Sequence, residues 1–371
     1  MVSALQELLD RHVNAGTAPG AVALLGGRDP EVVAAGRASV GGDPMPTDAI
    51  VRIQSMTKVI TAVAALRLVE AGRLDLDESV VGWLPELADR RVLRTPTAEL
   101  DDTEPARRDI TLHDLLTNTS GYGMVLVDSP LRRAMHDNGT ESGPEPPSLT
   151  ADDFLRRLAE LPLAFQPGAG WRYHHSFALL GILVARVAGR PLGEYLEDDL
   201  FGPLAMQDTG SWVPEEKLDR LPAAYRHTAD AFVEIEPASG GFYAGSPPFD
   251  VSHAELVSTA HDFHRFLRAL VDDDAKLISP AHLESLTTDQ VPAEAKTADS
   301  FFPGFWDGTG WGYGVAVQTD GPHRGRYGWA GGLGTDFFVD PDGTVGILLT
   351  QVEMGAAMAP LIAEFQETSK S

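Results

Sequence analysis

The sequence of 371 residues contains no cysteine, which excludes disulfide bonds, thiolate metal sites and a cysteine nucleophile and leaves the redox compartment open. It also has no apolar run of about 18 residues, so no membrane span is predicted. Basic residues are few, since 29 Lys and Arg stand against 54 Asp and Glu, for a net charge of −25. Because this charge repels phosphate, we expect neither nucleic acid nor an anionic membrane as a partner.

Motifs of several large enzyme classes are missing as well. The chain has no Gly-x-Ser-x-Gly elbow, which leaves an α/β-hydrolase without its nucleophile, and no phosphate-binding or dinucleotide fingerprint. The composition, with 43% apolar and 22% charged residues, is typical of a soluble globular protein. Residues 1–16 predict an amphipathic helix with Asp10 and Arg11 inside it, not a signal peptide, so we expect a cytoplasmic location.

Strand patterns occupy both ends of the chain, and helical patterns dominate between them. The predicted strands are 20–27, 31–38, 49–53, 312–319, 335–340 and 344–352. The predicted helices are 55–71, 111–121, 150–161, 176–189, 258–271 and 355–368. Pro341-Asp342-Gly343 predicts a tight turn, and therefore antiparallel pairing of the last two strands. Residues 123–149 read as a surface excursion beside a site.

This order of elements predicts an α+β fold. Strands from both ends would form one antiparallel sheet flanked by helices, and a mostly helical domain would be inserted between them. The predicted domains are 1–75 with 291–371 for the sheet and 76–290 for the helical part, with an active site at their interface.

One lysine stands in unusually apolar sequence. Lys58 lies in a predicted helix whose apolar residues cover every face, which is typical of a buried helix. The other lysines lie in polar, acidic or loop-like surroundings: Lys217, Lys276, Lys296 and Lys370. Burying an ammonium is costly unless it is paired or loses its proton. Ser55 precedes Lys58 by three residues on the same helix face, so a neutral Lys58 could activate it as a nucleophile. The alternative is a capping serine with a lysine that reaches the surface.

A nucleophilic Ser55 needs a proton donor for the leaving group and an oxyanion hole. Residues 166–181 offer the first, because a turn brings Tyr173 just before a new helix, which Ser176 could cap. Residues 326–340 offer the second, because their glycines allow close backbone approach beside a strand.

Three short motifs carry a resemblance to a known family. They are "SMTK" at 55–58, "YHH" at 173–175 and "WAGG" at 329–332, supported by "ITLHDLLTNTSGYG", by "LLG" after the tyrosine and by "LVSTAHDFHRFL". In this order the chain resembles the serine β-lactamase and penicillin-binding protein superfamily along nearly its whole length. It is most similar to the class C β-lactamase-like branch that includes family VIII carboxylesterases.

The resemblance implies a role for each matched position. Ser55 would be the acyl-accepting nucleophile, and Lys58 and Tyr173 would share general acid and base work, with the pKa of the tyrosine lowered by the lysine. The backbone N–H groups of Ser55 and Gly332 would form the oxyanion hole. Trp329, Gly331 and His175 would contact the substrate, and no cofactor or metal is implied.

Two departures from the family pattern bear on the substrate. His175 stands where relatives carry an asparagine that contacts the amide of β-lactams. Trp329 replaces a lysine or histidine that would hold a substrate carboxylate, and presents an apolar wall instead. Both changes favour a neutral, small-molecule ester over a β-lactam or a peptidoglycan peptide.

Several alternatives stay open on the sequence alone. Another acceptor could replace water, which would give an acyltransferase, and weak β-lactam or amide hydrolysis is a further option. A binding module without catalysis is disfavoured by the intact Ser55, Lys58 and Tyr173. His174 with His175, and His261 with His264, lack the further ligands of a metal site. The acyl and alcohol groups of the substrate and the oligomeric state are not specified by the sequence.

Overall fold

The computed structural model describes residues 2–142, 148–228, 231–239, 241–247, 254–272 and 277–370. Within them, an antiparallel seven-stranded sheet runs in the order β2-β1-β13-β12-β11-β10-β9. Its strands are β1 (Gly20–Gly26), β2 (Glu31–Gly36), β9 (Thr309–Trp311), β10 (Ala316–Gln318), β11 (Tyr327–Gly331), β12 (Thr335–Val339) and β13 (Val345–Leu349). Both ends of the chain therefore build one sheet, and the predicted α+β fold is confirmed.

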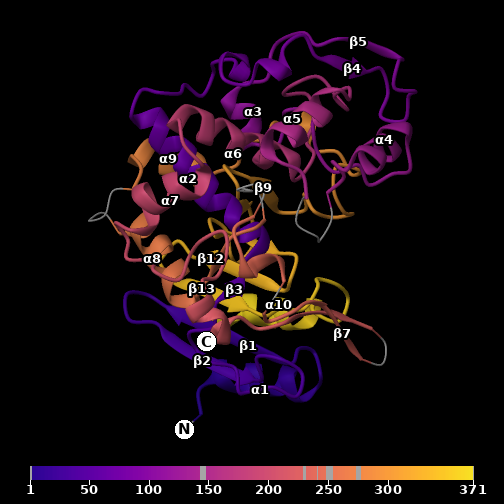
Figure 1. The fold of residues 1–371 in the computed structure, drawn as a ribbon. Helices are drawn as coiled ribbons and strands as arrows, with labels where there is room; N and C mark the ends of the chain where they lie inside the picture. The colour runs from indigo at the N-terminus through magenta and orange to yellow at the C-terminus, as the bar shows by residue number, and fades with distance from the viewer. Residues whose placement is uncertain are drawn as a thin grey trace.

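Helices fill the space above the sheet in the view of Figure 1 and also cover its lower face. They are α1 (Ala4–Asn14), α2 (Thr57–Glu70), α3 (Leu112–Leu116), α4 (Pro130–Asn138), α5 (Ala151–Ala159), α6 (His175–Ala188), α7 (Leu192–Leu196), α8 (Ala260–Val271), α9 (Pro280–Thr287) and α10 (Ala359–Gln366). Three short ribbons complete the described elements: β3 (Val51–Arg52) with β8 (Val257–Ser258), β4 (Arg91–Leu93) with β5 (Thr103–Pro105), and β6 (Ala224–His227) with β7 (Phe232–Glu236).

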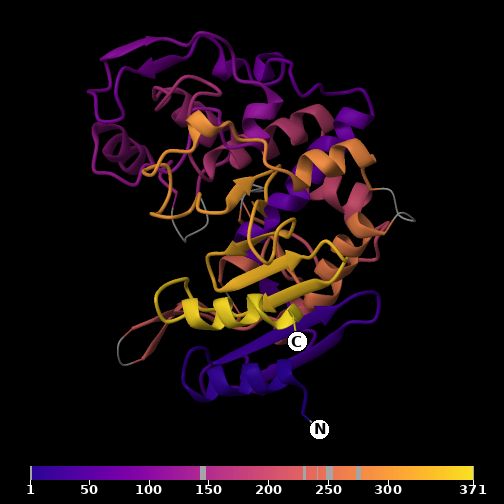
Figure 2. The same cartoon turned by 180° about the vertical axis from the view of Figure 1, so that it is seen from behind.

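The two faces of the sheet bury different cores, because side chains alternate along each strand. On β1, Val22 and Leu24 join the large core that also holds α2 and α6, while Ala21 and Ala23 pack against α1 and α10. Figure 2 shows α1 and α10 together on the outer side of the sheet. The helix α2 is thus enclosed between the sheet and the helical part of the molecule.

Several sequence predictions need correction. The strand at 49–53 pairs with β8 instead of joining the main sheet, and 312–319 holds a turn between β9 and β10. The excursion at 123–149 contains the helix α4, and residues 143–147 lie outside the described part. The helix α6 begins at His175, so Ser176 lies inside it and contacts the Ser120 hydroxyl instead of capping the helix. The predicted domain boundaries stay a prediction.

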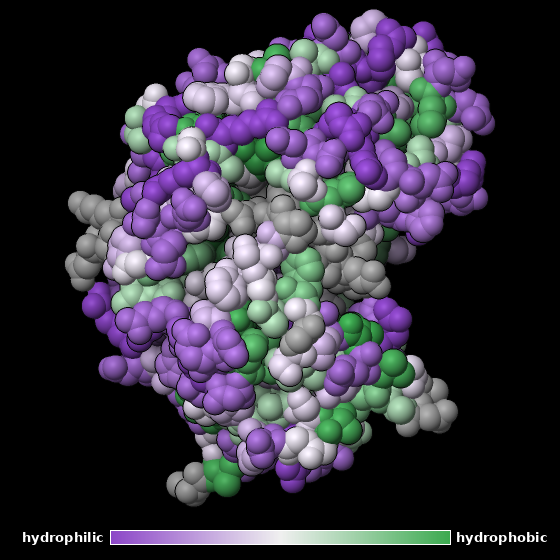
Figure 3. Space-filling model, in the orientation of Figure 1, coloured by the Kyte–Doolittle hydropathy of each residue, from purple (hydrophilic) through white to green (hydrophobic). Residues whose placement is uncertain are grey.

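The surface in Figure 3 is mostly hydrophilic, with hydrophobic residues scattered among polar ones, as the charge balance leads one to expect. No single helix among the described residues is long and apolar enough to cross a membrane. The bent pair of His175–Ala188 and Leu192–Phe201 meets that test by length and composition only.

Candidate active site

Ser55 lies where a strand becomes a helix at the centre of the molecule. Behind β3, a single 3-10 turn (Gln54–Met56) leads directly into α2, so Ser55 precedes the first residue of α2 by two positions. Gln54 adopts φ 53°, a left-handed conformation that costs energy for a residue with a side chain. This strained turn places Ser55 just before the start of α2, and Ser55 is 8% exposed.

Lys58 is completely buried, with 0% exposure, and its Nζ lies 3.0 Å from the Ser55 hydroxyl. Burial lowers the pKa of Lys58 to about 7, and a smaller opposing effect of Glu255 raises it. A large fraction of Lys58 is therefore neutral near pH 7 and can accept a proton. The Nζ also stands over the ring of Tyr173, 4.6 Å from its centroid. The predicted contact of Ser55 and Lys58 is present.

Tyr173 comes from a distant part of the chain, immediately before α6, and is 6% exposed. His174, which follows it, adopts φ 93° and ψ −70°, outside the regions that most residues occupy. This unusual turn stops the chain from entering α6 one residue earlier and leaves the Tyr173 ring facing Lys58. The indole Nε1–H of Trp329 donates a hydrogen bond of 2.6 Å to the Tyr173 hydroxyl.

The expected effect of Lys58 on Tyr173 is not what the structure shows. Burial raises the pKa of Tyr173 above its usual value, and hydrogen bonds with Ser55 and Trp329 only partly oppose the rise. Lys58 faces the ring of Tyr173, where it cannot stabilise a phenolate as directly as at the oxygen. The phenol is therefore protonated at neutral pH, so it can donate a proton but is a poor base.

The end of β11 packs tightly on the turn that carries Ser55. A Cβ on Gly331 would come within 2.2 Å of Thr335 Oγ1 and 2.6 Å of the Ile53 carbonyl oxygen, so only glycine fits. Thr335 Oγ1 also donates a hydrogen bond of 3.0 Å to the Ile53 carbonyl. Gly332 follows next to the Gln54 side chain. The structure thus places Gly331 and Gly332 against the turn that carries Ser55, and their oxyanion-hole role stays a prediction.

His175 lies in the first turn of α6 and is buried. Its Nε2 is 2.8 Å from the Thr140 carbonyl oxygen, and its ring stacks on Phe154. Burial lowers the pKa of His175 to about 4, which keeps it neutral and a donor to that carbonyl. These contacts anchor the helix start to the segment after α4. The contact of His175 with a substrate stays a prediction.

An aromatic cluster surrounds Tyr173 and Trp329. Trp311 meets Trp329 edge to face at 4.7 Å, and Trp171 stacks on Tyr173 at 6.0 Å. Phe301 contacts the same tyrosine at 5.1 Å. Trp306 belongs to this cluster too, whereas Tyr313 lies in the main core. Aromatic walls of this kind bind apolar groups more readily than ions.

Two site neighbours were missed by reading the sequence. Gln54 looked unremarkable but carries the strained turn, and Glu255 is a buried carboxylate that acts on Lys58. Their only sequence signal was adjacency to motifs. His264, on the helix predicted at 258–271, is buried, and its Nε2 is 2.8 Å from the Gly27 carbonyl oxygen. The helix predicted at 111–121 ends at Leu116, and Asn118 and Gly121 beyond it adopt positive φ angles that are incompatible with a helix.

Features elsewhere in the molecule do not add to this site. Among the described residues, no group of three His, Asp or Glu side chains could hold a metal ion. Lys217 and Lys296 form ion pairs with Asp208 and Asp289. Lys276 lies outside the described residues, as does the side chain of Lys370. A cavity of 1260 Å³ is lined by α6, α7 and residues 207–217, and contains none of the predicted site residues.

Comparison with known proteins places these observations in context. A model of the Beta-lactamase family matches residues 5–363. Esterase EstB of Burkholderia gladioli is 32% identical over 344 residues, which cover 86% of this chain and 82% of EstB. Monacolin J acid methylbutanoyltransferase of Aspergillus terreus is 34% identical over 253 residues, 66% of this chain and 58% of the relative. The structure of EstCE1, a hydrolase with promiscuous acyltransferase activity, superposes with a TM-score of 0.82 at 26% identity and covers 97% of both chains.

Proposed function

Because this chain belongs to the Beta-lactamase family, with esterases and acyltransferases among its relatives, we propose that it is a serine carboxylesterase acting through an acyl-enzyme on Ser55. The observation that carries the proposal is the completely buried Lys58, whose Nζ lies 3.0 Å from the Ser55 hydroxyl. A lysine in this position serves no evident purpose for folding, because its burial opposes stability.

In the first half of the proposed reaction, the Ser55 oxygen attacks the carbonyl carbon of the ester. The Ser55 proton moves to the neutral Nζ of Lys58, and the carbonyl oxygen takes up the negative charge. The backbone N–H groups of Ser55 and Gly332 would stabilise that charge. Collapse of the intermediate then breaks the bond to the alcohol oxygen, which receives a proton from the Tyr173 hydroxyl, and the Lys58 ammonium returns a proton to Tyr173.

In the second half, water attacks the acyl-enzyme and gives its proton to the same base. The Ser55 oxygen leaves, regains a proton, and the carboxylic acid is released. The raised pKa of Tyr173 and the lowered pKa of Lys58 support this division of labour, with Lys58 as the base and Tyr173 as the acid.

A neutral ester suits the surroundings of Ser55 better than a charged substrate. The Trp329 indole donates a hydrogen bond to the Tyr173 hydroxyl and packs against Trp311. An apolar aromatic surface therefore stands where the family pattern has a lysine or histidine. Burying a substrate carboxylate there without a partner would be costly. We therefore propose an ester with an apolar acyl or alcohol group.

Acyl transfer to an alcohol is the second candidate, because one relative is a methylbutanoyltransferase and EstCE1 has promiscuous acyltransferase activity. Adding a nucleophilic alcohol during turnover of a p-nitrophenyl ester separates the two. Release of free acid at an undiminished rate supports the esterase. Transfer that outruns hydrolysis would replace the esterase proposal with the transferase.

Labelling with a fluorophosphonate probe tests the nucleophile directly. We expect one adduct on Ser55, found by peptide mass spectrometry, and none in Ser55→Ala. Ser285→Ala is the matched control, because Ser285 is a half-buried serine on α9, where it donates to the Ala281 carbonyl. Tyr173→Phe should lower kcat by at least about 10², which is typical of lost proton transfer. A folded wild-type protein without an adduct on Ser55 would exclude every acyl-enzyme mechanism.

A further inference from the structure

Glu255 is a buried carboxylate beside the site, 5% exposed, with no part in the reaction described so far. The pairing of β3 with β8 fixes its place. Arg52 is opposite Val257, and the Ile53 N–H donates to the Leu256 carbonyl at 3.0 Å. Glu255 directly precedes Leu256, whose carbonyl is bonded to Ile53, so it lies close to the turn that carries Ser55.

A second contact ties the same segment to the start of α2. The Leu256 N–H donates to Thr57 Oγ1 at 3.3 Å, and Thr57 directly precedes Lys58. Glu255 is therefore held between the residues that precede Ser55 and those that precede Lys58.

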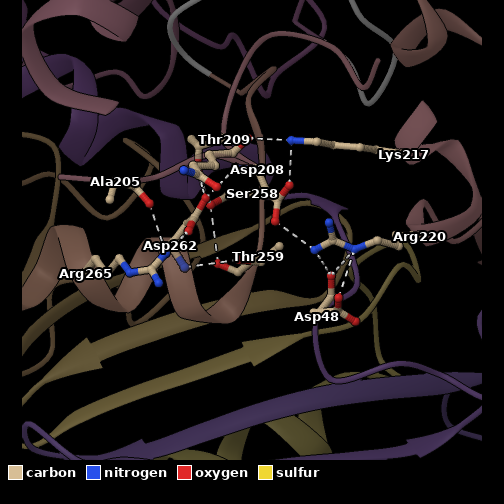
Figure 4. A network of polar contacts seen from close by, with 11 residues as sticks. Asp48, Ala205, Asp208, Thr209, Lys217, Arg220, Ser258, Thr259, Asp262 and Arg265 are labelled. Carbon is tan, nitrogen blue, oxygen red and sulfur yellow. Dashed lines mark hydrogen bonds and ion pairs between the residues drawn. The ribbon is translucent and has the colours of Figure 1, made fainter. Parts of the chain in front are cut away.

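The short strand β8, two residues after Glu255, is anchored by polar contacts (Figure 4). Ser258 Oγ and Thr209 Oγ1 are 2.8 Å apart, and Thr209 Oγ1 donates to Asp262 at 3.2 Å. Asp262 in turn receives a hydrogen bond from the Asp208 N–H. Val257 also pairs with Gly210 through both backbone groups. This network limits the movement of the segment after Glu255, which allows its charge to act at a fixed place.

Glu255 acts electrostatically on Lys58. One carboxylate oxygen accepts a hydrogen bond of 2.8 Å from the Ala254 N–H. Among the groups of the described residues that face the Lys58 Nζ or act on it are Ser55, the Tyr173 ring, His175 and Glu255. Of these, Glu255 alone carries a negative charge and raises the pKa of Lys58.

We propose that Glu255 is a positioning residue that stabilises the ammonium formed when Lys58 takes the proton of Ser55. The inference rests on the proposed function. In that step the Ser55 O–H bond breaks, an N–H bond forms on Lys58 and the bond from Ser55 to the acyl carbon forms, while Glu255 stays ionised throughout. A carboxylate next to a base that gains charge acts in the same sense in other serine hydrolases, where it stabilises the protonated base.

The rate of Ser55 labelling by a fluorophosphonate across pH tests this role without knowledge of the substrate. The rate should rise with pH as Lys58 loses its proton. Because Glu255 raises the pKa of Lys58, Glu255→Gln should move this rise to lower pH and reduce its plateau by about tenfold, since the base is weaker. With a p-nitrophenyl ester, kcat should fall while KM stays within about twofold.

Glu236→Gln is the matched control. Glu236 and Glu255 both raise the pKa of Tyr243, but only Glu255 acts on Lys58. The control should leave the pH of the rise unchanged. Glu255→Asp keeps the charge at a greater distance, and it should shift the rise in the same direction by less. If circular dichroism shows that Glu255→Gln does not fold, the shift measured with Glu255→Asp tests the role of Glu255 in its place.

The outcomes separate the two proposals. A folded Glu255→Gln whose rate rises at the wild-type pH, or a Glu236→Gln that shifts it equally, overturns the role of Glu255 and leaves Ser55 as nucleophile. If only Glu255→Asp folds and its labelling rate rises at the wild-type pH, the role of Glu255 is likewise overturned. If wild type is not labelled at Ser55, the proposed function fails first.

Discussion

Replacing Lys58 with methionine should make the protein more stable and inactive. In the folded state burial lowers the pKa of Lys58 from 10.5 to about 7. At about 1.4 kcal/mol for each pH unit, holding the ammonium in the fold costs about 5 kcal/mol at pH 6, where both states are protonated. Loss of the hydrogen bond to Ser55 returns about 1 kcal/mol. Lys58→Met should therefore raise the free energy of unfolding by about 4 kcal/mol at pH 6.

The pH dependence has a definite sign. Between pH 7 and 10.5 the unfolded lysine binds more protons than the folded one, so wild-type stability rises with pH in this window. The gap to Lys58→Met should thus shrink to about 1 kcal/mol or less at pH 9.5. Urea denaturation followed by fluorescence at pH 6 and 9.5 measures both values.

Lys217→Met provides the comparison, because Lys217 lies near the surface, bonds the Gln207 carbonyl and pairs with Asp208. It should bring no gain in stability. The reasoning is refuted if Lys58→Met is no more stable than wild type at pH 6, or if its advantage is as large at pH 9.5. Either result would mean that Lys58 keeps its charge in the fold at little cost.

Three further changes test the surroundings of Ser55 and the sheet. Trp329→Phe removes the donor to the Tyr173 hydroxyl and should lower kcat about tenfold with little change in folding, measured by ester turnover and thermal melting. Asp336→Asn should stabilise the protein at pH 8 but not at pH 4, because burial raises the pKa of Asp336 to about 7 and the charged form is disfavoured above it; equal denaturation midpoints at pH 8 would contradict this. Gly331→Ala should cost about 1–3 kcal/mol and abolish labelling of Ser55, whereas Gly332→Ala, whose Cβ has room, should keep the fold.

Much of the fold follows from local sequence signals. Pro341-Asp342-Gly343 marks the β12–β13 turn because such residues adopt the required backbone angles, and the structure has the hairpin there. Thr259 caps α8 through a hydrogen bond to the Asp262 N–H, as a threonine before an apolar helical pattern predicts. The contact of Ser55 and Lys58 follows in the same way, since the two residues stand three positions apart at a helix start.

Other parts depend on tertiary contacts that no local pattern encodes. The strand predicted at 49–53 is apolar apart from Arg52, yet its residues 51 and 52 pair with β8 and not with the main sheet, because the pairing depends on a segment far along the chain. The position of His264 along its helix is typical of a surface residue, but its ring contacts the Gly27 carbonyl oxygen. The pKa of Tyr173 is raised mainly by its burial, which is a result of tertiary packing that a three-residue motif does not specify.

The place of β13 in the sheet has a consequence for how the protein is made. The strand lies between β1 and β12, with Val22 opposite Leu349, although these residues come from opposite ends of the chain. During synthesis β1 and β2 can form a hairpin early, but the open edge of β1 must wait until almost the whole chain has left the ribosome. Contacts of such long range slow folding and leave an apolar strand edge exposed to other chains. A chaperone that shields "GAVALLG" in this interval should raise the yield of native protein, and a chain that ends before β13 should aggregate.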